Sequence, residues 1–210
     1  MASNPSTTFH KPHVLVVEGK DDFWVCVALL KALAIESVQV IDTGGFENLA
    51  PQLKLFTKTP GWASVRRVAV MVDCDGDAVA RATSVKGSLK KAGLAEPAEP
   101  GVFAGQEPAV AYCLVPSGGG CLEDLICAAL ADGDIRATCV DSFIACSGLQ
   151  DDVSSKRPKA WVHAYIAVTQ PGLKVGEAAN AGILKLESKP YELIRSLILA
   201  LQTNPESQAA

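Results

Sequence analysis

The sequence predicts an α/β fold: an open, mostly parallel sheet flanked by helices, followed by a helical C-terminal extension. Three observations predict it. Short apolar runs typical of strands buried on both faces alternate with segments of helical periodicity. Their order is strand, helix, strand, helix, strand, helix, loop, strand, helix, which favours a parallel sheet covered on both faces. From residue 133 onward only helical patterns follow.

The first elements of this order are two strands and two helices. The apolar run 13–17 predicts the first strand, and it ends in the polar residues EGKDD. Residues 21–34 carry apolar side chains at intervals of three and four, which places them on one helical face. The β-branched run 38–41 predicts the second strand, and residues 46–56 predict the second helix. Between them lies 43–45, Thr-Gly-Gly, a turn or a point of close backbone approach to a ligand.

Two further strands and two further helices complete the predicted core. The run 68–72 predicts the third strand, and residues 78–89 follow it as a helix weakened by an internal glycine. Residues 92–109 are rich in proline, glycine and alanine and predict a surface loop. A fourth strand is expected over 109–116 and a fourth helix over 122–131.

The remainder of the chain is expected to be helical. Helices are predicted at 134–147, 156–168 and 189–202. A length of 210 residues suits one large domain. We therefore expect residues 1–132 to form the α/β core and residues 133–210 to pack on the same domain.

Composition narrows the classes of protein that the chain belongs to. Its 49% hydrophobic and 20% charged residues are typical of a globular protein. No apolar run approaches the roughly 20 residues of a membrane span, and the start MASNPSTTFHKPH lacks a signal-peptide pattern, so a cytoplasmic location is expected. The net charge of -4 argues against non-specific coating of nucleic acid, although a local basic face is allowed.

The cysteines predict reduced, packed thiols. Their number is odd, most lie in apolar runs, and no C-x-x-C pair occurs, which argues against disulfides and zinc. The seven are Cys26, Cys74, Cys113, Cys121, Cys127, Cys139 and Cys146.

Carboxylates follow two of the predicted strands. Glu18 comes directly after the first strand, and Asp73, Asp75 and Asp77 follow the third. In an open α/β sheet the functional crevice lies beyond the carboxyl ends of the strands, so these side chains converge if the two strands are neighbours. Such a cluster needs a cation, and Mg²⁺, or Mn²⁺ in its place, suits carboxylate ligands. The alternative for Asp77, as for Asp22, is a helix-capping role.

Other interpretations of the stretch DCDGD can be tested in the sequence. A calcium-binding loop would need glycine and glutamate where Ala78 and Ser84 stand, so that interpretation fails. A phosphatase of the haloacid dehalogenase type fits the strand and the D-x-D-G, but Asp77 stands where Thr or Val is usual. That alternative stays open. No nucleotide P-loop and no G-x-G-x-x-G occurs.

Two stretches together resemble the Toprim domain, which implies a Rossmann-like sheet. They are VVEGKDD at 16–22 and VMVDCDGD at 70–77, and the first also resembles ribonuclease M5 and the OLD nucleases. Two later stretches, at 121–130 and 154–168, resemble the small DUF3226 family of Toprim-like proteins.

The resemblance implies roles for the acidic residues. Glu18 would be the general acid or base, with Asp73 and Asp75 as the catalytic pair that holds Mg²⁺. The metal ligands that it implies are Glu18, Asp73, Asp75, Asp77 and Glu123, with Asp124 as a further candidate. For Glu123 the alternative is an acidic first helical turn that complements the helix dipole.

Basic residues are needed to hold phosphates. Lys20 lies beside Glu18, and Lys156 and Arg157 precede Trp161 and Tyr165, whose rings are candidates for stacking on bases. The spacing of these two aromatic residues also suits a packed helical face, which we favour. Four more basic residues mark the polar side of the predicted third helix, as phosphate ligands or as a solvated face: Arg81, Lys86, Lys90 and Lys91.

The leading hypothesis is a Mg²⁺-dependent nuclease of the Toprim type, or a related protein that handles phosphodiesters, acting on nucleic acid and not on membranes. One alternative is a non-catalytic module that binds nucleic acid or nucleotides within a larger defence or repair assembly. The other is the phosphatase.

Overall fold

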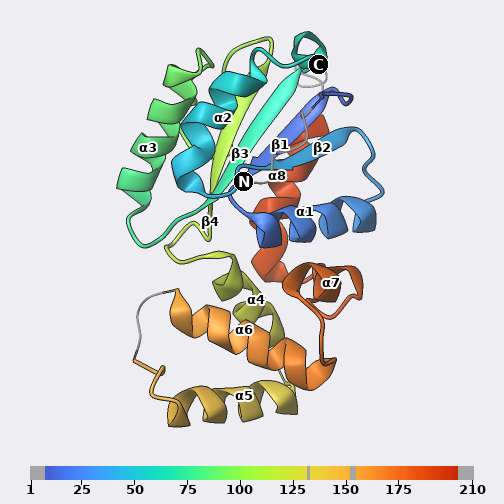
Figure 1. The fold of residues 1–210 in the computed structure, drawn as a ribbon, viewed down its shortest axis with the longest axis vertical. Coiled ribbons are helices and arrows are strands. Elements are labelled where there is room, and N and C mark those ends of the chain that lie inside the picture. The colour runs from blue at the N-terminus through green and yellow to red at the C-terminus, as the bar shows by residue number, and fades with distance from the viewer. Residues whose placement is uncertain (1–7, 132, 152–154, 203–210) are drawn as a thin grey trace, which may run out of the picture.

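A four-stranded parallel sheet forms the core of the protein (Figure 1). The computed structural model describes residues 8–131, 133–151 and 155–202. The strands lie in the order β2-β1-β3-β4. They are β1 (His13–Val17), β2 (Val38–Asp42), β3 (Arg67–Asp73) and β4 (Ala109–Val115). The predicted α/β fold class, a Toprim-like open parallel sheet flanked by helices, is confirmed.

Helices cover both faces of the sheet, as Figure 1 shows. One face carries α1 (Lys20–Ala32) and α8 (Glu192–Gln202), and the other carries α2 (Leu49–Phe56) and α3 (Ala78–Lys91). Successive strand side chains point to opposite faces: Leu15 packs in the same core cluster as α1, whereas Val16 packs in the cluster of α2 and α3. Burial on both faces explains why the strands are unbroken apolar runs.

A helical layer lies beyond the carboxyl ends of the strands (Figure 1). It contains α4 (Leu122–Leu130), α5 (Ile135–Cys146), α6 (Lys156–Thr169) and α7 (Val175–Asn180). Helix α6 contacts both α4 and α5, while α7 packs along α1. The chain then returns to the sheet, where α8 contacts β1, β3 and β4. Residue 132, the predicted boundary between core and extension, lies outside the described residues.

The sequence did not predict helix α7. This helix has six residues and includes Gly176, so it is too short for a helical periodicity to be recognised. Three 3₁₀ turns complete the description: Phe46–Asn48 before α2, Trp62–Ser64 before β3, and Lys189–Tyr191 before α8.

The prediction of packed thiols is correct for some cysteines and wrong for others. All seven are free, and the buried ones are Cys26, Cys74, Cys113 and Cys121. Cys127 is half-buried, whereas Cys139 and Cys146 are exposed on α5.

The described helices give no sign of a membrane span. None of those in residues 8–131, 133–151 and 155–202 combines the length and the apolar character that crossing a bilayer requires.

Candidate functional site

The parallel register places the ends of β1 and β3 side by side. Val17, the last residue of β1, pairs with Met71, and Asp73, the last residue of β3, pairs with Val115. Glu18 therefore leaves the sheet next to Asp73. The position is the carboxyl edge of the parallel sheet, where open α/β folds form their ligand sites.

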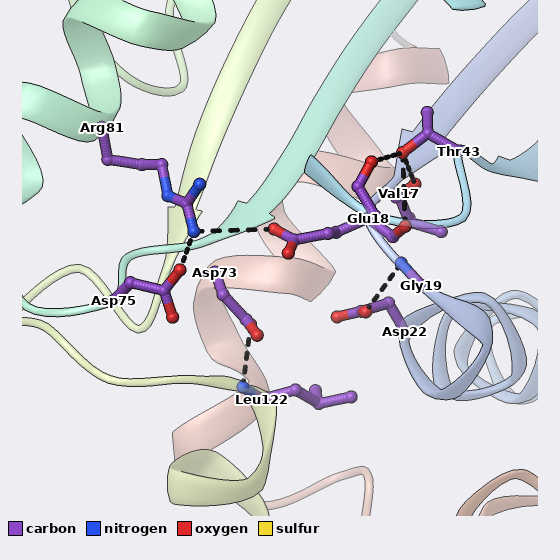
Figure 2. A network of polar contacts seen from close by, with 10 residues as sticks. Val17, Glu18, Gly19, Asp22, Thr43, Asp73, Asp75, Arg81 and Leu122 are labelled. Carbon is purple, nitrogen blue, oxygen red and sulfur yellow. Dashed lines mark hydrogen bonds and ion pairs between the residues drawn. The ribbon is translucent and has the colours of Figure 1, made fainter. Parts of the chain in front are cut away.

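Three carboxylates point toward one another at this edge, from the ends of β1 and β3 and from the first turn of α1 (Figure 2). They belong to Glu18, Asp73 and Asp22, and we call this place the acidic crevice. Asp73 Oδ1 accepts a hydrogen bond from the N–H of Leu122, the first residue of α4, at 2.9 Å. Asp22 Oδ2 accepts one from the N–H of Gly19 at 3.1 Å. These bonds hold two of the carboxylates on backbone donors.

The acidic crevice is electrostatically unfavourable without a cation. Burial, together with the charges of Asp22, Glu18 and Glu123, raises the pKa of Asp73 to about 8. Burial, together with the charges of Glu18 and Glu123, likewise raises the pKa of Asp22 to about 7. Glu123, only 6% exposed in the first turn of α4, thus faces the same crevice. A bound cation would relieve both the repulsion and the desolvation.

Arg81 of α3 already supplies one positive charge. Its guanidinium forms an ion pair with Asp75 and lies 3.9 Å from Glu18 Oε2 (Figure 2). It also stacks over the ring of Phe46, with 4.0 Å between the guanidinium carbon and the ring centroid. The side chain is 11% exposed, so this cation is fixed by its surroundings.

The two aspartates of the D-x-D sequence point in different directions. Asp75 adopts a left-handed backbone conformation, φ 55°, and Gly76 follows with φ 104°. The chain turns sharply here, so Asp73 faces α4 while Asp75 faces Arg81 (Figure 2). Because the two carboxylates are separated, the D-x-D is not a ready-made chelating pair in this conformation.

The Thr-Gly-Gly turn after β2 positions Glu18. The hydroxyl of Thr43 lies 3.2 Å from the carbonyl oxygen of Glu18, and the N–H of Gly45 donates to that same oxygen at 2.9 Å. Gly45 has φ 120°, and a β-carbon there would lie 2.6 Å from the Glu47 carboxylate, so only glycine suits the position. The backbone of Glu18 is thereby fixed, while its Oε2 atom is buried without a hydrogen-bond partner among the described residues.

Two other predicted acidic residues have capping contacts. Asp77 is the N-cap of α3, and its Oδ1 accepts from the N–H of Ala80 at 2.9 Å. Asp124 Oδ2 accepts from the N–H of Cys121 at 2.8 Å. For Asp77 this is the capping alternative that the sequence left open, and we leave both residues out of the proposed ligand set.

The predicted basic residues lie at two separate places. Lys20 is exposed in the first turn of α1, two residues from Glu18. Lys156 and Arg157 are exposed at the start of α6, where Arg157 lines a cavity of about 200 Å³ with residues of α4 and α5. Lys20 lies near Glu18 in sequence, and Arg81, also among the predicted basic residues, contacts Glu18.

The aromatic residues of α6 are packed, as favoured from their spacing. Trp161 and Tyr165 are 4% and 1% exposed, and their rings stack with 5.3 Å between centroids. The indole N–H donates to Asp141 at 2.8 Å, and the Tyr165 hydroxyl donates to Asp134 at 2.6 Å. These rings are not available to stack on bases.

The donor chemistry of the crevice fits a divalent cation, although its side chains are not gathered into a metal cage. Across the parts of the chain that the structure describes, no three His, Cys, Asp or Glu side chains lie close enough together to hold a metal ion. Mg²⁺ commonly uses only one or two carboxylates and takes its other ligands from water and substrate phosphates. The Glu18 Oε2 atom, which has no hydrogen-bond partner among the described residues, and the raised pKa of Asp73 fit that mode of binding.

The sequence predicted only part of the role of two crevice residues. Asp22 was expected as a helix cap, a contact that it makes with the N–H of Gly19, but its place in the crevice was not predicted. Arg81 was expected as a phosphate ligand or as part of a solvated face, and its contact with Glu18 depends on how α3 crosses the sheet, which no local pattern reveals.

Comparison with known proteins gives a family and a fold. The family described as "Protein of unknown function (DUF3226)" matches residues 12–200. Among solved structures, the C-terminal region of the Burkholderia pseudomallei OLD protein is similar, with 16% identity and a TM-score of 0.50, over 92% of this chain and 100% of that one. The C-terminal region of the Xanthomonas campestris pv. campestris OLD protein is similar at 15% identity and a TM-score of 0.51, over 92% and 95% of the two chains. No curated protein matches the sequence.

Proposed function

The chain belongs to the DUF3226 family of proteins of unknown function, and we propose that its acidic crevice binds Mg²⁺ or Mn²⁺ and cleaves phosphodiester bonds in nucleic acid. The observation that carries the proposal is the convergence of Glu18, Asp22 and Asp73 at the carboxyl edge of the sheet. The resemblance of Glu18, Asp73 and Asp75 to the Toprim sequence pattern supports the same chemistry. The likeness to the OLD structures supports the fold alone.

The proposed ligands of the cation are the carboxylates that face the crevice. Asp73 is the central one, and Asp22 or Glu123, whose charges raise the pKa of Asp73, would supply a second carboxylate. When bound, the ion would polarise a phosphate oxygen and lower the pKa of a coordinated water. Ionised carboxylates are required, so binding of the cation displaces the protons that the raised pKa values of Asp22 and Asp73 imply near neutral pH.

Glu18 is the proposed general acid or base. Its backbone is fixed by the Thr-Gly-Gly turn, and its Oε2 atom has no hydrogen bond among the described residues. A carboxylate in this state can take a proton from an attacking water or give one to the leaving oxygen, provided that it comes within about 2.6–3.2 Å of that group.

Arg81 is the proposed phosphate ligand. Its guanidinium now pairs with Asp75 beside Glu18, where it neutralises negative charge. A phosphodiester entering the crevice offers the same bidentate geometry as a carboxylate, so Arg81 can exchange Asp75 for the phosphate. That exchange would free Asp75, the second member of the predicted metal pair, as the substrate arrives.

Cleavage of labelled nucleic acid tests the proposal. Single- and double-stranded DNA and RNA are incubated with Mg²⁺, Mn²⁺ or EDTA, using the wild type, Glu18→Gln and Asp73→Asn. Glu36→Gln, on the exposed loop before β2 at the opposite edge of the sheet, is the matched control. We expect metal-dependent cleavage in the wild type and the control, and its loss in both crevice variants.

The alternatives give different results in the same assays. A non-catalytic module binds nucleic acid without cutting it under any metal condition. A phosphatase releases phosphate from a small ester and leaves the polymers intact. Cleavage that survives in both Glu18→Gln and Asp73→Asn refutes the assignment of the crevice.

A further inference from the structure

A separate pocket lies along helix α1, the helix whose residue Asp22 faces the acidic crevice. It has a volume of about 530 Å³, within the usual range for small-ligand sites. Its walls come from the first turns of α1 and from the neighbouring helix α7, whose close packing on α1 is visible in Figure 1. The polar and aromatic lining residues are Lys20, Asp21 and Trp24 of α1, and Lys174, Glu177 and Asn180 at α7.

Trp24 presents an aromatic surface in this pocket. It is 46% exposed, unlike Trp161, which is buried. Its inner side is held firmly: a β-carbon on Gly176 would lie 2.4 Å from Trp24 Cβ, so the α7 backbone packs directly against the base of the side chain. The ring of Phe23 lies edge-on to the indole, with 5.1 Å between centroids. An exposed indole that is fixed at its base is suited to stacking.

Two lysines and two carboxylates line the pocket. Glu177 Oε2 accepts from the backbone N–H of Lys174 at 2.8 Å, so this carboxylate is used to start α7. Asp21 lies in the first turn of α1, where a carboxylate complements the helix dipole. Lys20 and Lys174 are both exposed and supply positive charge on the two sides of the pocket.

The pocket and the crevice both adjoin the first turns of α1. Lys20 and Trp24 lie four residues apart and so share one face of α1, while Asp22, between them in sequence, turns its carboxylate away from that face and into the crevice. A strand with a phosphodiester at Asp73 would have to pass over the first turn of α1, beside Lys20, to place a neighbouring nucleotide at Trp24.

We propose that this pocket binds one nucleotide of a single-stranded nucleic acid, with the base stacked on Trp24 and the flanking phosphates on Lys20 and Lys174. The assignment rests on the proposed function, because it identifies the strand that the crevice cuts as single-stranded or locally opened. Stacking on an indole is tolerant of sequence, so the pocket positions the strand without selecting bases.

The test measures binding in EDTA, where no cleavage can occur by the proposed chemistry. A fluorescein-labelled oligothymidylate of about ten nucleotides and an oligouridylate of equal length are titrated with the protein, and anisotropy reports binding. In the wild type we also expect quenching of the tryptophan fluorescence. Trp24→Leu should weaken binding roughly 5- to 100-fold and abolish most of the quenching, and Trp24→Phe should restore part of the affinity.

The lysines have a separate signature. Removal of one phosphate contact should lower the slope of log affinity against log salt by about 0.7 for a single strand, so Lys174→Ala should flatten this plot. Lys54→Ala is the matched control, since Lys54 is an exposed lysine of α2 on the other face of the sheet. Circular dichroism checks that each variant is folded, and Leu and Phe both retain the Cβ and Cγ atoms that Gly176 contacts.

The outcomes separate this proposal from the proposed nuclease. Binding that depends on Trp24, in a protein that cuts nothing, supports the pocket and refutes cleavage. If the wild type cleaves nucleic acid but Trp24→Leu binds the oligonucleotides with the same affinity as the wild type, the pocket proposal is refuted and the nuclease proposal is retained. Absence of oligonucleotide binding in the wild type also overturns the pocket.

Discussion

Replacement of Asp73 by asparagine should stabilise the metal-free protein at alkaline pH. Asp73 is largely buried next to other carboxylates, and its pKa is raised from 3.8 to about 8. Between these values the folded state holds a proton that the unfolded state has lost, so the free energy of unfolding falls as pH rises from about 4 to about 8. Asparagine has no such proton, yet its side-chain oxygen can still accept from the N–H of Leu122.

The size of the effect follows from the pKa. Each pKa unit corresponds to about 1.4 kcal/mol, so three pH units between 5 and 8 set a ceiling of about 4 kcal/mol for Asp73. Single stabilising substitutions usually raise the free energy of unfolding by about 0.5–2 kcal/mol. The gain here should fall below the ceiling because Asp22 and Glu18 remain and the surroundings relax. We expect the stability difference between Asp73→Asn and the wild type to grow by about 1–2 kcal/mol from pH 5 to pH 8.

Urea unfolding followed by circular dichroism in EDTA, at pH intervals from 5 to 8, measures this difference. Asp77→Asn is the control, because Asp77 is an exposed N-cap of α3 and asparagine caps equally well. The plot of its unfolding free energy against pH should run parallel to that of the wild type. A parallel curve for Asp73→Asn would show that the crevice carboxylates do not repel one another, and the electrostatic reasoning for a cation would fail.

Three further predictions concern the crevice and its neighbours. Arg81→Met should tighten Mn²⁺ binding to the protein without substrate, because a competing cation is removed, and it should also reduce cleavage. Calorimetric titration measures the Mn²⁺ affinity, and the cleavage assay measures the activity. Weaker Mn²⁺ binding by Arg81→Met would contradict the proposed exchange. Mg²⁺ at about 100 times its dissociation constant should raise the unfolding free energy by about 2.7 kcal/mol in the wild type, an increment that thermal unfolding should find missing in Asp73→Asn. Gly176→Ala should cost about 1–3 kcal/mol because the new methyl group meets Trp24, whereas Gly87→Ala in α3, where the space is open, should gain about 0.5–1 kcal/mol; equal effects in urea unfolding would refute the packing argument.

The sheet could be predicted from the sequence because its strands carry strong local signals. Each apolar run is buried on both faces, and the first and third end in acidic residues at the carboxyl edge, so the sequence alone predicts Glu18 and Asp73 in a common crevice. The parallel register needed only that β1 and β3 be neighbours. Regular elements with repeated patterns are therefore recoverable from periodicity.

The finer arrangement of the site depends on tertiary geometry. Whether Asp75 faces Asp73 or Arg81 is decided by the left-handed conformation at Asp75 itself, which its residue type permits but does not dictate. Asp22 has the same sequence signature as a helix cap, and burial against α4 gives it its raised pKa. The pocket at Trp24 requires α7, a helix of six residues that no periodicity reveals.

Binding of Mn²⁺ tests the central claim most directly. Electron paramagnetic resonance of free Mn²⁺, titrated with the protein at pH 8, reports the affinity without any substrate. The account predicts binding by the wild type and by Glu36→Gln, and an affinity at least about tenfold lower in Asp73→Asn, a loss of about 1.4 kcal/mol. Equal Mn²⁺ affinity in Asp73→Asn and the wild type, or no binding in the wild type, would contradict the assignment of the acidic crevice as a divalent-cation site.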